Sequence, residues 1–227
     1  MAAFTFAQNS NIHMKLNMRL QAATSVLLFT GLLSCQKEVV SSPTNTSTDN
    51  IESITKQVAS SDTFTTYTIC TGQHYCDHNN YPYFEAPALY FTVKFDSSAI
   101  YQSAKSQNQY DENKLYGFSD NNSFHQLFSA RFGWRWCNGE LQLSAYTYNN
   151  GVRSDKVLGA VPIGVANKCA IIVQGDHYNF VVNGVVTSVP RESKTTVAKG
   201  YKLLPYFGGD EVAPHTVIIK IKEDQGL

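Results

Sequence analysis

The chain has 227 residues, 43% of them hydrophobic, and its 18 basic residues balance its 18 acidic residues. This length suffices for one all-β domain with appended segments. The balanced charge excludes the large basic surface expected of a nucleic-acid-binding protein. All but three of the aromatic residues follow residue 60, so the folded domain is expected there.

Residues 1–35 have the features of a secretory targeting segment. Lys15 and Arg19 precede a short apolar run, AATSVLLFTGLL (22–33). This run is shorter than the roughly 20 residues that a membrane-spanning helix needs. It ends in LLSC, which resembles a bacterial lipobox, whose cysteine becomes the lipidated first residue of the mature protein. We therefore expect a lipoprotein signal peptide with Cys35 as the lipidation site; an ordinary signal peptide is the alternative.

Residues 36–61 are rich in Ser and Thr and poor in large apolar side chains. Such a segment cannot bury enough apolar surface to fold, and it predicts a flexible tether. Together the two segments predict a lipoprotein anchored to the outer membrane of a bacterial cell envelope, facing either the periplasm or the outside.

Four further cysteines follow the tether, and disulfides are permitted in this compartment. An even number suggests two bridges, for which three pairings exist. Cys70 with Cys76 is the local option, which leaves Cys137 with Cys169. A zinc site made of all four cysteines is the alternative, but no pair has the two-residue spacing typical of zinc ligands.

Residues 62–227 predict one antiparallel β-domain. Short alternating or apolar runs, separated by turn residues, are expected as strands at 63–69, 89–95, 114–119, 129–136, 140–148, 157–163, 169–175, 178–183, 185–190, 201–207 and 216–222. Asn-Gly dipeptides at 138–139, 150–151 and 183–184 are strong hairpin signals. About eleven short strands with such turns predict a sandwich or barrel. Residues 97–106 predict one helical turn or a loop.

The hairpin at 129–148 contains both tryptophans. If Asn138-Gly139 is a two-residue turn, one face of the hairpin carries Phe132, Trp134, Trp136, Leu141, Leu143 and Ala145. This apolar face is predicted to be core. The alternative is that Trp134 and Trp136 stack on the sugar rings of a ligand.

The opposite face of the hairpin is polar but lacks the Lys, Glu and Thr typical of a solvated face. Arg and Gln offer planar donors and Tyr offers flat rings, which suits hydroxyl-rich or carboxylated ligands. Lys202 and Tyr206 of the last strand of that sheet are expected to join it. The predicted glycan-binding residues are Arg131, Arg135, Gln142, Tyr146, Tyr148, Lys202 and Tyr206. A polar face without a ligand is the competing interpretation.

Two polar loops invite a metal-binding interpretation. His74, Asp77 and His78 stand close together, although an aromatic-flanked loop is the commoner explanation. The oxygen-rich segment GGDEVAPH (208–215) could hold calcium between loops, with a solvated turn as the alternative. No other cofactor is expected.

The segment CAIIVQGDHYNFVVNGVVTSVPR (169–191), with its Asn-Gly hairpin, resembles the concanavalin-like lectin/glucanase jelly rolls, including laminin-G-type modules. Residues 94–101, 113–120, 129–136 and 200–222 are similar to uncharacterised lipoproteins of Gram-negative bacteria. The resemblance implies a single antiparallel concanavalin-like jelly-roll sandwich. It implies no established activity.

The sequence can be compared with two classes of enzyme that have this fold, glycoside hydrolases and polysaccharide lyases. The glycoside hydrolases place two carboxylates on one strand at period-two spacing, and no such pattern occurs here. The polysaccharide lyases remove a proton beside a uronate carboxylate with a His/Tyr pair, while Arg and Gln hold that carboxylate. YFGGD (206–210) is similar to one lyase motif, Y-F-K-A-G, but Q-I-H is absent and glycine at position 133 replaces the glutamate of R-x-E.

The sequence therefore predicts a membrane-anchored lipoprotein whose β-sandwich binds a glycan or polysaccharide without catalysis. A structural or assembly module without a small ligand is the first alternative, and a polysaccharide (uronate) lyase is the second.

Overall fold

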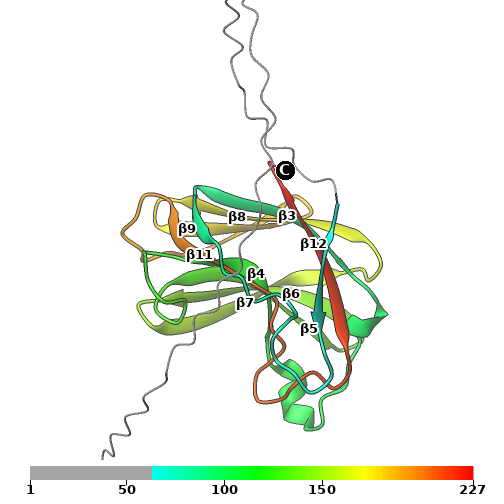
Figure 1. Ribbon diagram of the computed structural model, residues 1–227. Helices are drawn as coiled ribbons and strands as arrows, with labels where there is room; N and C mark the ends of the chain where they lie inside the picture. The colour runs from blue at the N-terminus through cyan, green and yellow to red at the C-terminus, as the bar shows by residue number, and fades with distance from the viewer. Residues whose placement is uncertain (1–62, 227) are drawn as a thin grey trace, which may run out of the picture. The chain divides into compact units, whose positions relative to one another are not determined.

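Two antiparallel sheets of six strands each face one another across the core of the computed structural model, which describes residues 63–226 (Figure 1). The predicted signal peptide, Cys35 and the tether lie outside the described residues. The strand orders are β1-β12-β3-β8-β9-β10 and β2-β11-β4-β5-β6-β7. This is the antiparallel concanavalin-like jelly-roll sandwich expected from the sequence.

The first sheet contains β1 (Thr65–Ile69), β12 (Val217–Asp224), β3 (Ala88–Phe95), β8 (Ala166–Gln174), β9 (His177–Val182) and β10 (Val185–Pro190). The second contains β2 (Tyr83–Ala86), β11 (Ala198–Leu203), β4 (Asn113–Ser119), β5 (Ser129–Cys137), β6 (Glu140–Asn149) and β7 (Val152–Val161). Two short 3-10 turns, η1 (Ser97–Ala99) and η2 (Ser106–Tyr110), connect β3 to β4. No helix within the described range is long and apolar enough to cross a membrane.

The predicted register of the β5–β6 hairpin is confirmed. Asn138 and Gly139 have φ angles of 55° and 77°, as a type I′ turn requires. Trp134 pairs with Leu143, and Arg131 pairs with Tyr146. The turn therefore fixes which side chains face the core.

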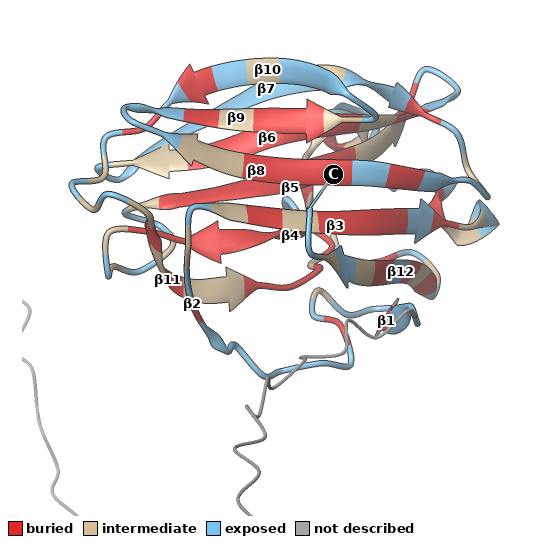
Figure 2. Ribbon diagram, turned by 90° about the horizontal axis from the view of Figure 1, so that it is seen from above, coloured by how far each residue is buried: buried red, intermediate tan, exposed pale blue. Residues whose placement is uncertain are grey.

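The core lies between the sheets and is rich in aromatic rings. Phe132 packs edge-on against Phe91 of β3 and Phe180 of β9, with ring centroids 5.5 and 5.0 Å apart. Trp134 packs against Phe95 at 5.5 Å. In β12 buried residues alternate with more exposed ones, because successive side chains of a strand point to opposite faces, whereas β5 is buried along most of its length (Figure 2). Both sheets thus contribute one apolar face to a shared core.

Three strands, β2, β7 and β11, differ most from the prediction. β2 was not predicted, because only four residues form it. β7 begins directly after the Asn150-Gly151 turn, and its polar residues are exposed because β7 is an edge strand. β11 ends at Leu203, two residues before Pro205, which has no N–H for a ladder.

The predicted disulfides are not formed, since all four cysteines of the described residues are free thiols. Cys76 pairs with Ile69 on the core side, and alternation along the strand turns Cys70 to the exposed side. Cys137 lies on the outer face of β5, where its thiol donates to Gln142 Oε1 at 3.1 Å. Cys169 lies in the core between the sheets, so the second sheet separates it from Cys137.

A buried ion pair connects two long loops. Asp120, directly after β4, accepts hydrogen bonds from Arg191 Nε at 2.8 Å and from the Tyr178 hydroxyl at 2.7 Å. Its Oδ1 also accepts the Lys199 backbone N–H at 3.1 Å. Arg191 donates further to Ser193, 3.0 Å away. This network fixes the start of loop 120–128 against the segment that leads into β11.

Candidate functional site

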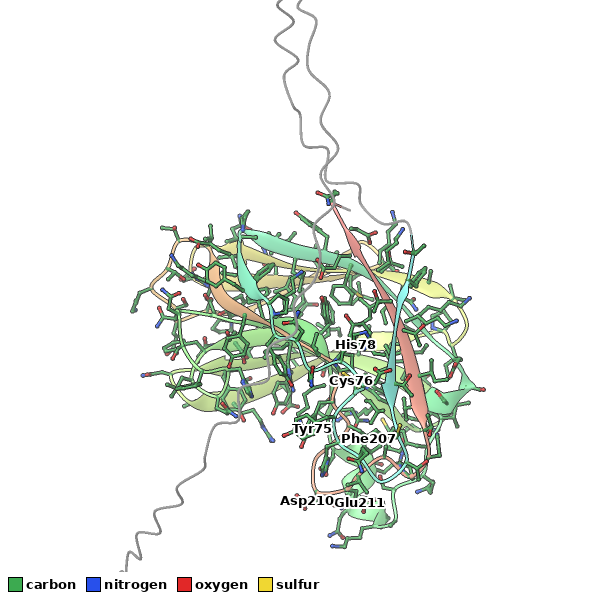
Figure 3. The ribbon with its side chains drawn as sticks, in the orientation of Figure 1. Tyr75, Cys76, His78, Phe207, Asp210 and Glu211 are labelled. Carbon is green, nitrogen blue, oxygen red and sulfur yellow. The ribbon has the colours of Figure 1, made fainter. Side chains whose placement is uncertain are left out.

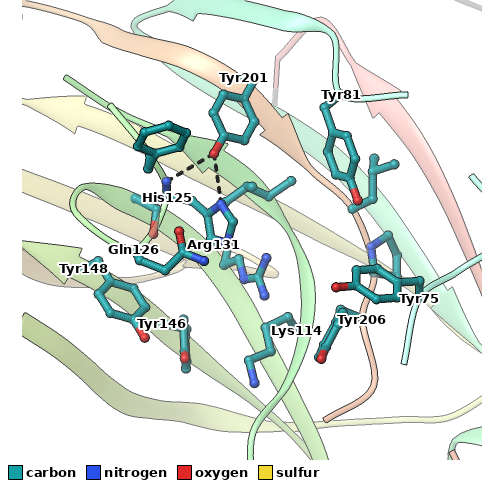
Figure 4. A pocket seen from close by; sticks show the side chains of 15 residues that line it. Tyr75, Tyr81, Lys114, His125, Gln126, Arg131, Tyr146, Tyr148, Tyr201 and Tyr206 are labelled. Atoms are coloured by element: carbon teal, nitrogen blue, oxygen red, sulfur yellow. Dashed lines mark hydrogen bonds between the residues drawn. The ribbon is translucent and has the colours of Figure 1, made fainter. Parts of the chain in front are cut away.

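A cavity of about 760 Å³ opens on the outer face of the second sheet (Figure 4). Strands β4, β5 and β6 form its floor, β11 and the residues after it form one side, and loops 70–82 and 120–128 complete the wall. Its lining residues are Tyr75, Tyr81, Lys114, Phe124, His125, Gln126, Ser129, Arg131, Tyr146, Tyr148, Tyr201, Leu203, Leu204, Pro205 and Tyr206. We call it the tyrosine pocket.

Arg131 lies on the floor of the tyrosine pocket and is only 9% exposed. Its guanidinium carbon lies 5.7 Å from the centre of the Tyr146 ring. No hydrogen bond or ion pair joins the guanidinium to any other residue of the described range. Burial lowers the pKa of Arg131 to about 10, so the group stays charged at neutral pH. A buried charge without a partner is costly, and an anion would offset that cost.

Six tyrosines border this charge, and no acidic residue of the described range lines the pocket. Tyr146 and Tyr148 stand edge to face with centroids 5.9 Å apart, and Tyr75 meets Tyr206 in the same way at 4.9 Å. Tyrosine rings stack on sugar rings and their hydroxyls bond sugar hydroxyls. The pocket therefore combines positive charge with flat aromatic surfaces.

Loop 120–128 supplies the one imidazole among the lining residues of the pocket, that of His125. The His125 Nδ1 lies 2.9 Å from the Tyr201 hydroxyl, which also accepts the His125 backbone N–H at 3.2 Å (Figure 4). Burial and the charge of Arg131 lower the pKa of His125, so its imidazole is neutral at neutral pH. A neutral imidazole can accept a proton from a ligand.

Of the predicted glycan-binding residues, the structure brings Arg131, Tyr146, Tyr148 and Tyr206 together in the tyrosine pocket. Their role in binding stays a prediction.

Arg135 and Gln142 do not line the pocket. Arg135 Nη1 lies 3.2 Å from Glu112 Oε1, and its Nε donates to Gln142 Oε1 at 3.2 Å. Glu112 in turn accepts from Ser144 Oγ at 2.8 Å. These side chains form a mostly buried cluster beside the pocket, in which Glu112 Oε1 has the charge of Arg135 nearby but no hydrogen bond within the described residues, and burial raises the pKa of Glu112.

The packing around Gly133 leaves no room there for the glutamate of the lyase motif R-x-E. A Cβ at position 133 would collide with Ser144 Oγ and would lie 2.7 Å from Glu112 Oε2. The carboxylate of Glu112, the residue directly before β4, thus occupies the space that a side chain at 133 would need.

Lys202 does not share a face with Tyr206, contrary to the prediction. Its ammonium pairs with Glu223 at 2.5 Å, on the other side of β11 from the pocket. The prediction was wrong because β11 ends at Leu203, and the break at Pro205 interrupts the strand alternation that would relate the two residues. Tyr201 is the residue of β11 that enters the pocket.

The candidate metal ligands of the two polar loops contact other protein groups. His74 Nδ1 lies 2.8 Å from the Phe207 carbonyl oxygen, while Asp77 and His78 bond each other at 2.8 Å. Glu211 accepts backbone N–H groups from Ala104 and Lys105 at 2.8 and 2.9 Å.

Asp210 and His215 also have separate surroundings. The Asp210 N–H donates to Asp111, and His215 Nε2 lies 2.8 Å from the Ser98 carbonyl. Figure 3 shows Asp210 and Glu211 well apart from His78. Within residues 63–226, no three His, Cys, Asp or Glu side chains gather in a way that could hold a metal.

Sequence reasoning missed the remaining polar residues of the pocket. Lys114 lies in a predicted strand, but its facing partners depend on a bulge between Lys114 and Gly117. His125 and Gln126 lie in a loop without periodicity. The adjacent His and Gln were the only signal that could have drawn attention to this loop.

No family profile matches the sequence, and no curated protein does. Among solved structures, the alginate lyase AlyC3 is similar with a TM-score of 0.49 and 12% identity, covering 71% of this chain and 74% of that one. The family 7 alginate lyase A1-II′, in complex with a product, has a TM-score of 0.42 and 12% identity over 71% and 80%.

A laminarinase catalytic domain from Thermotoga petrophila RKU-1 has a TM-score of 0.45 and 11% identity, covering 70% of this chain and 75% of that one. These proteins have concanavalin-like jelly-roll folds. Similarity at this level assigns no activity to the chain.

Proposed function

We propose that the chain is a lipid-anchored protein of a bacterial cell envelope whose β-sandwich binds an acidic, uronate-type glycan in the tyrosine pocket. The observation that carries the proposal is Arg131, a buried cation without a carboxylate partner among the described residues, in a pocket without acidic side chains. A ligand carboxylate would supply the missing negative charge through bidentate hydrogen bonds. Cys35 and the tether support the anchoring.

The acid-free lining argues against glycoside hydrolysis at this site. That reaction needs two carboxyl groups flanking the scissile bond, one as acid and one as base or nucleophile. No lining residue of the tyrosine pocket supplies either. The Glu112 carboxylate, which does not line the pocket, is held by Arg135 and Ser144.

Arg131→Met should weaken the binding of a uronate oligomer. Loss of a charge-assisted hydrogen bond costs about 1.5–3 kcal/mol, so a uronate oligomer should bind roughly tenfold to 150-fold more weakly. Calorimetry with the soluble domain, residues 60–227, measures this against a panel of uronate and neutral gluco-oligomers.

Lys156→Met is the matched control, because Lys156 is an exposed cation on β7 outside the pocket. Uronate affinity that survives Arg131→Met would contradict the assignment of the pocket. A wild-type domain that binds none of the oligomers would favour the structural or assembly module.

A uronate lyase is the second candidate, and the neutral His125 beside Tyr201 favours it. In such an elimination a base removes the proton next to the carboxylate, and the leaving oxygen departs after protonation by an acid. The reaction would form an unsaturated uronate that absorbs ultraviolet light. Absorbance that rises with wild type but not with His125→Asn, at equal binding, would establish the lyase.

A further inference from the structure

Lys114 places a second positive charge beside Arg131. Its ammonium donates to the Gly208 carbonyl oxygen at 2.7 Å. The same nitrogen lies 5.4 Å from the centre of the Tyr146 ring and 5.6 Å from that of Tyr206. Since Arg131 lies 5.7 Å from the Tyr146 ring as well, two cations border one aromatic ring.

Glycines on β4 and β5 make this arrangement possible. Lys114 faces Gly133, and Arg131 faces Gly117. A Cβ at position 117 would collide with the Cβ of Arg131. Both long side chains therefore lie opposite residues without side chains, which leaves them free to extend over the floor of the pocket.

The charge of Lys114 is poorly compensated within the protein. The charged and titratable groups facing it are Arg131, Arg153, Asp111, Glu112, Tyr146 and Tyr206. Glu112 is engaged by Arg135 and Ser144, and Asp111 accepts the Asp210 backbone N–H. Burial, and then the charges of Arg131 and Arg153, lower the pKa of Lys114 to about 8.

We propose that the ammonium of Lys114 and the guanidinium of Arg131 bind the acidic group of the glycan from two sides, and that this binding takes up a proton onto Lys114 above neutral pH. The inference rests on the proposed function and specifies how the tyrosine pocket holds its ligand.

The pH dependence follows from linkage. Below about pH 8 Lys114 is already charged, so affinity should not change with pH. Above the pKa of the free protein, each ligand must recruit a proton to Lys114, and affinity falls by up to about tenfold per pH unit until the pKa of the complex is reached. A neutral sugar would show no such dependence.

Calorimetry of a uronate oligomer between about pH 7 and about pH 9.5 tests the inference. Wild type and Lys156→Met should lose up to about tenfold in affinity over this range, the full contribution of the Lys114 charge. Lys114→Arg keeps its charge, so its affinity should change less than about twofold. Lys114→Met should bind about tenfold more weakly than wild type at pH 7, and its affinity should not fall further as the pH rises.

Carbon NMR of lysine side chains adds a direct readout, with the Lys114 signal assigned by its absence in Lys114→Arg. The best-binding uronate, or free glucuronate if no oligomer binds, should raise the titration midpoint of Lys114. This inference would be overturned if a uronate bound without moving the titration midpoint of Lys114. It would also be overturned if the affinity of Lys114→Arg fell with pH as steeply as that of wild type. Either result would leave the proposed function standing. No uronate binding and no shift would overturn both.

Discussion

Asp120→Asn is expected to lower the free energy of unfolding by about 3–5 kcal/mol, because it leaves the buried guanidinium of Arg191 without its counter-charge. Arg191 is 4% exposed and Asp120 is fully buried, so water cannot replace the lost partner. The isosteric amide keeps the shape of the side chain, which separates the loss of charge from a packing defect. Urea denaturation followed by tryptophan fluorescence measures the change.

The same variant should alter the pH dependence of stability. Burial raises the pKa of Asp120, but hydrogen bonds from Arg191 and Tyr178 outweigh this effect and hold the pKa below its ordinary value. A depressed pKa stabilises the fold above the unfolded value of about 3.9, and this contribution is lost as pH falls through the folded pKa. Wild type should therefore lose more stability than Asp120→Asn between neutral pH and about pH 3.

Lys199→Met is the control for the ion pair. Lys199 pairs with Glu85 at 3.2 Å on the surface, where both groups are solvated, so its removal should change stability little. If Asp120→Asn and Lys199→Met lowered the free energy of unfolding equally, burial would not be the reason for the stabilising effect of the Asp120–Arg191 ion pair. Because Asp120 begins the loop that carries His125, Asp120→Asn should also weaken ligand binding at temperatures where the domain is still folded.

Trp134→Ala is expected to destabilise the domain by about 3–5 kcal/mol while leaving the pocket chemistry in place. Trp134 is 0% exposed and packs against Phe95, Tyr101 and Phe207, with centroids 5.5, 5.8 and 6.0 Å away. Its removal leaves a cavity between the two sheets. Thermal unfolding followed by circular dichroism measures the loss.

Two further variants sharpen the test of Trp134. The indole N–H of Trp134 is buried without a hydrogen-bond partner among the described residues, so Trp134→Phe should cost clearly less than Trp134→Ala. Phe124→Ala removes a ring that is 73% exposed at the pocket wall, and its effect should appear in ligand affinity with unchanged unfolding. A Trp134→Ala domain as stable as Phe124→Ala would mean that the hairpin faces were assigned the wrong way round.

The sequence by itself determined the fold and the faces of its central hairpin. Asn138 and Gly139 tolerate the positive φ angles of a type I′ turn, and a two-residue turn fixes the register of β5 and β6. With the register fixed, period-two alternation placed Trp134 in the core and Arg131 on the outer face. These conclusions depend only on neighbours in the chain, which is why a sequence can carry them.

Only the tertiary structure decided which polar residues share the tyrosine pocket. His125 reaches it from a loop without periodicity, held by Tyr201, which lies 76 positions later in the chain. Lys114 meets Arg131 because of a bulge in β4 and two facing glycines. Arg135 lies on the same face as Arg131 but forms an ion pair with Glu112. Strand alternation sets the direction of a side chain, but loop packing and strand irregularities decide what that side chain meets.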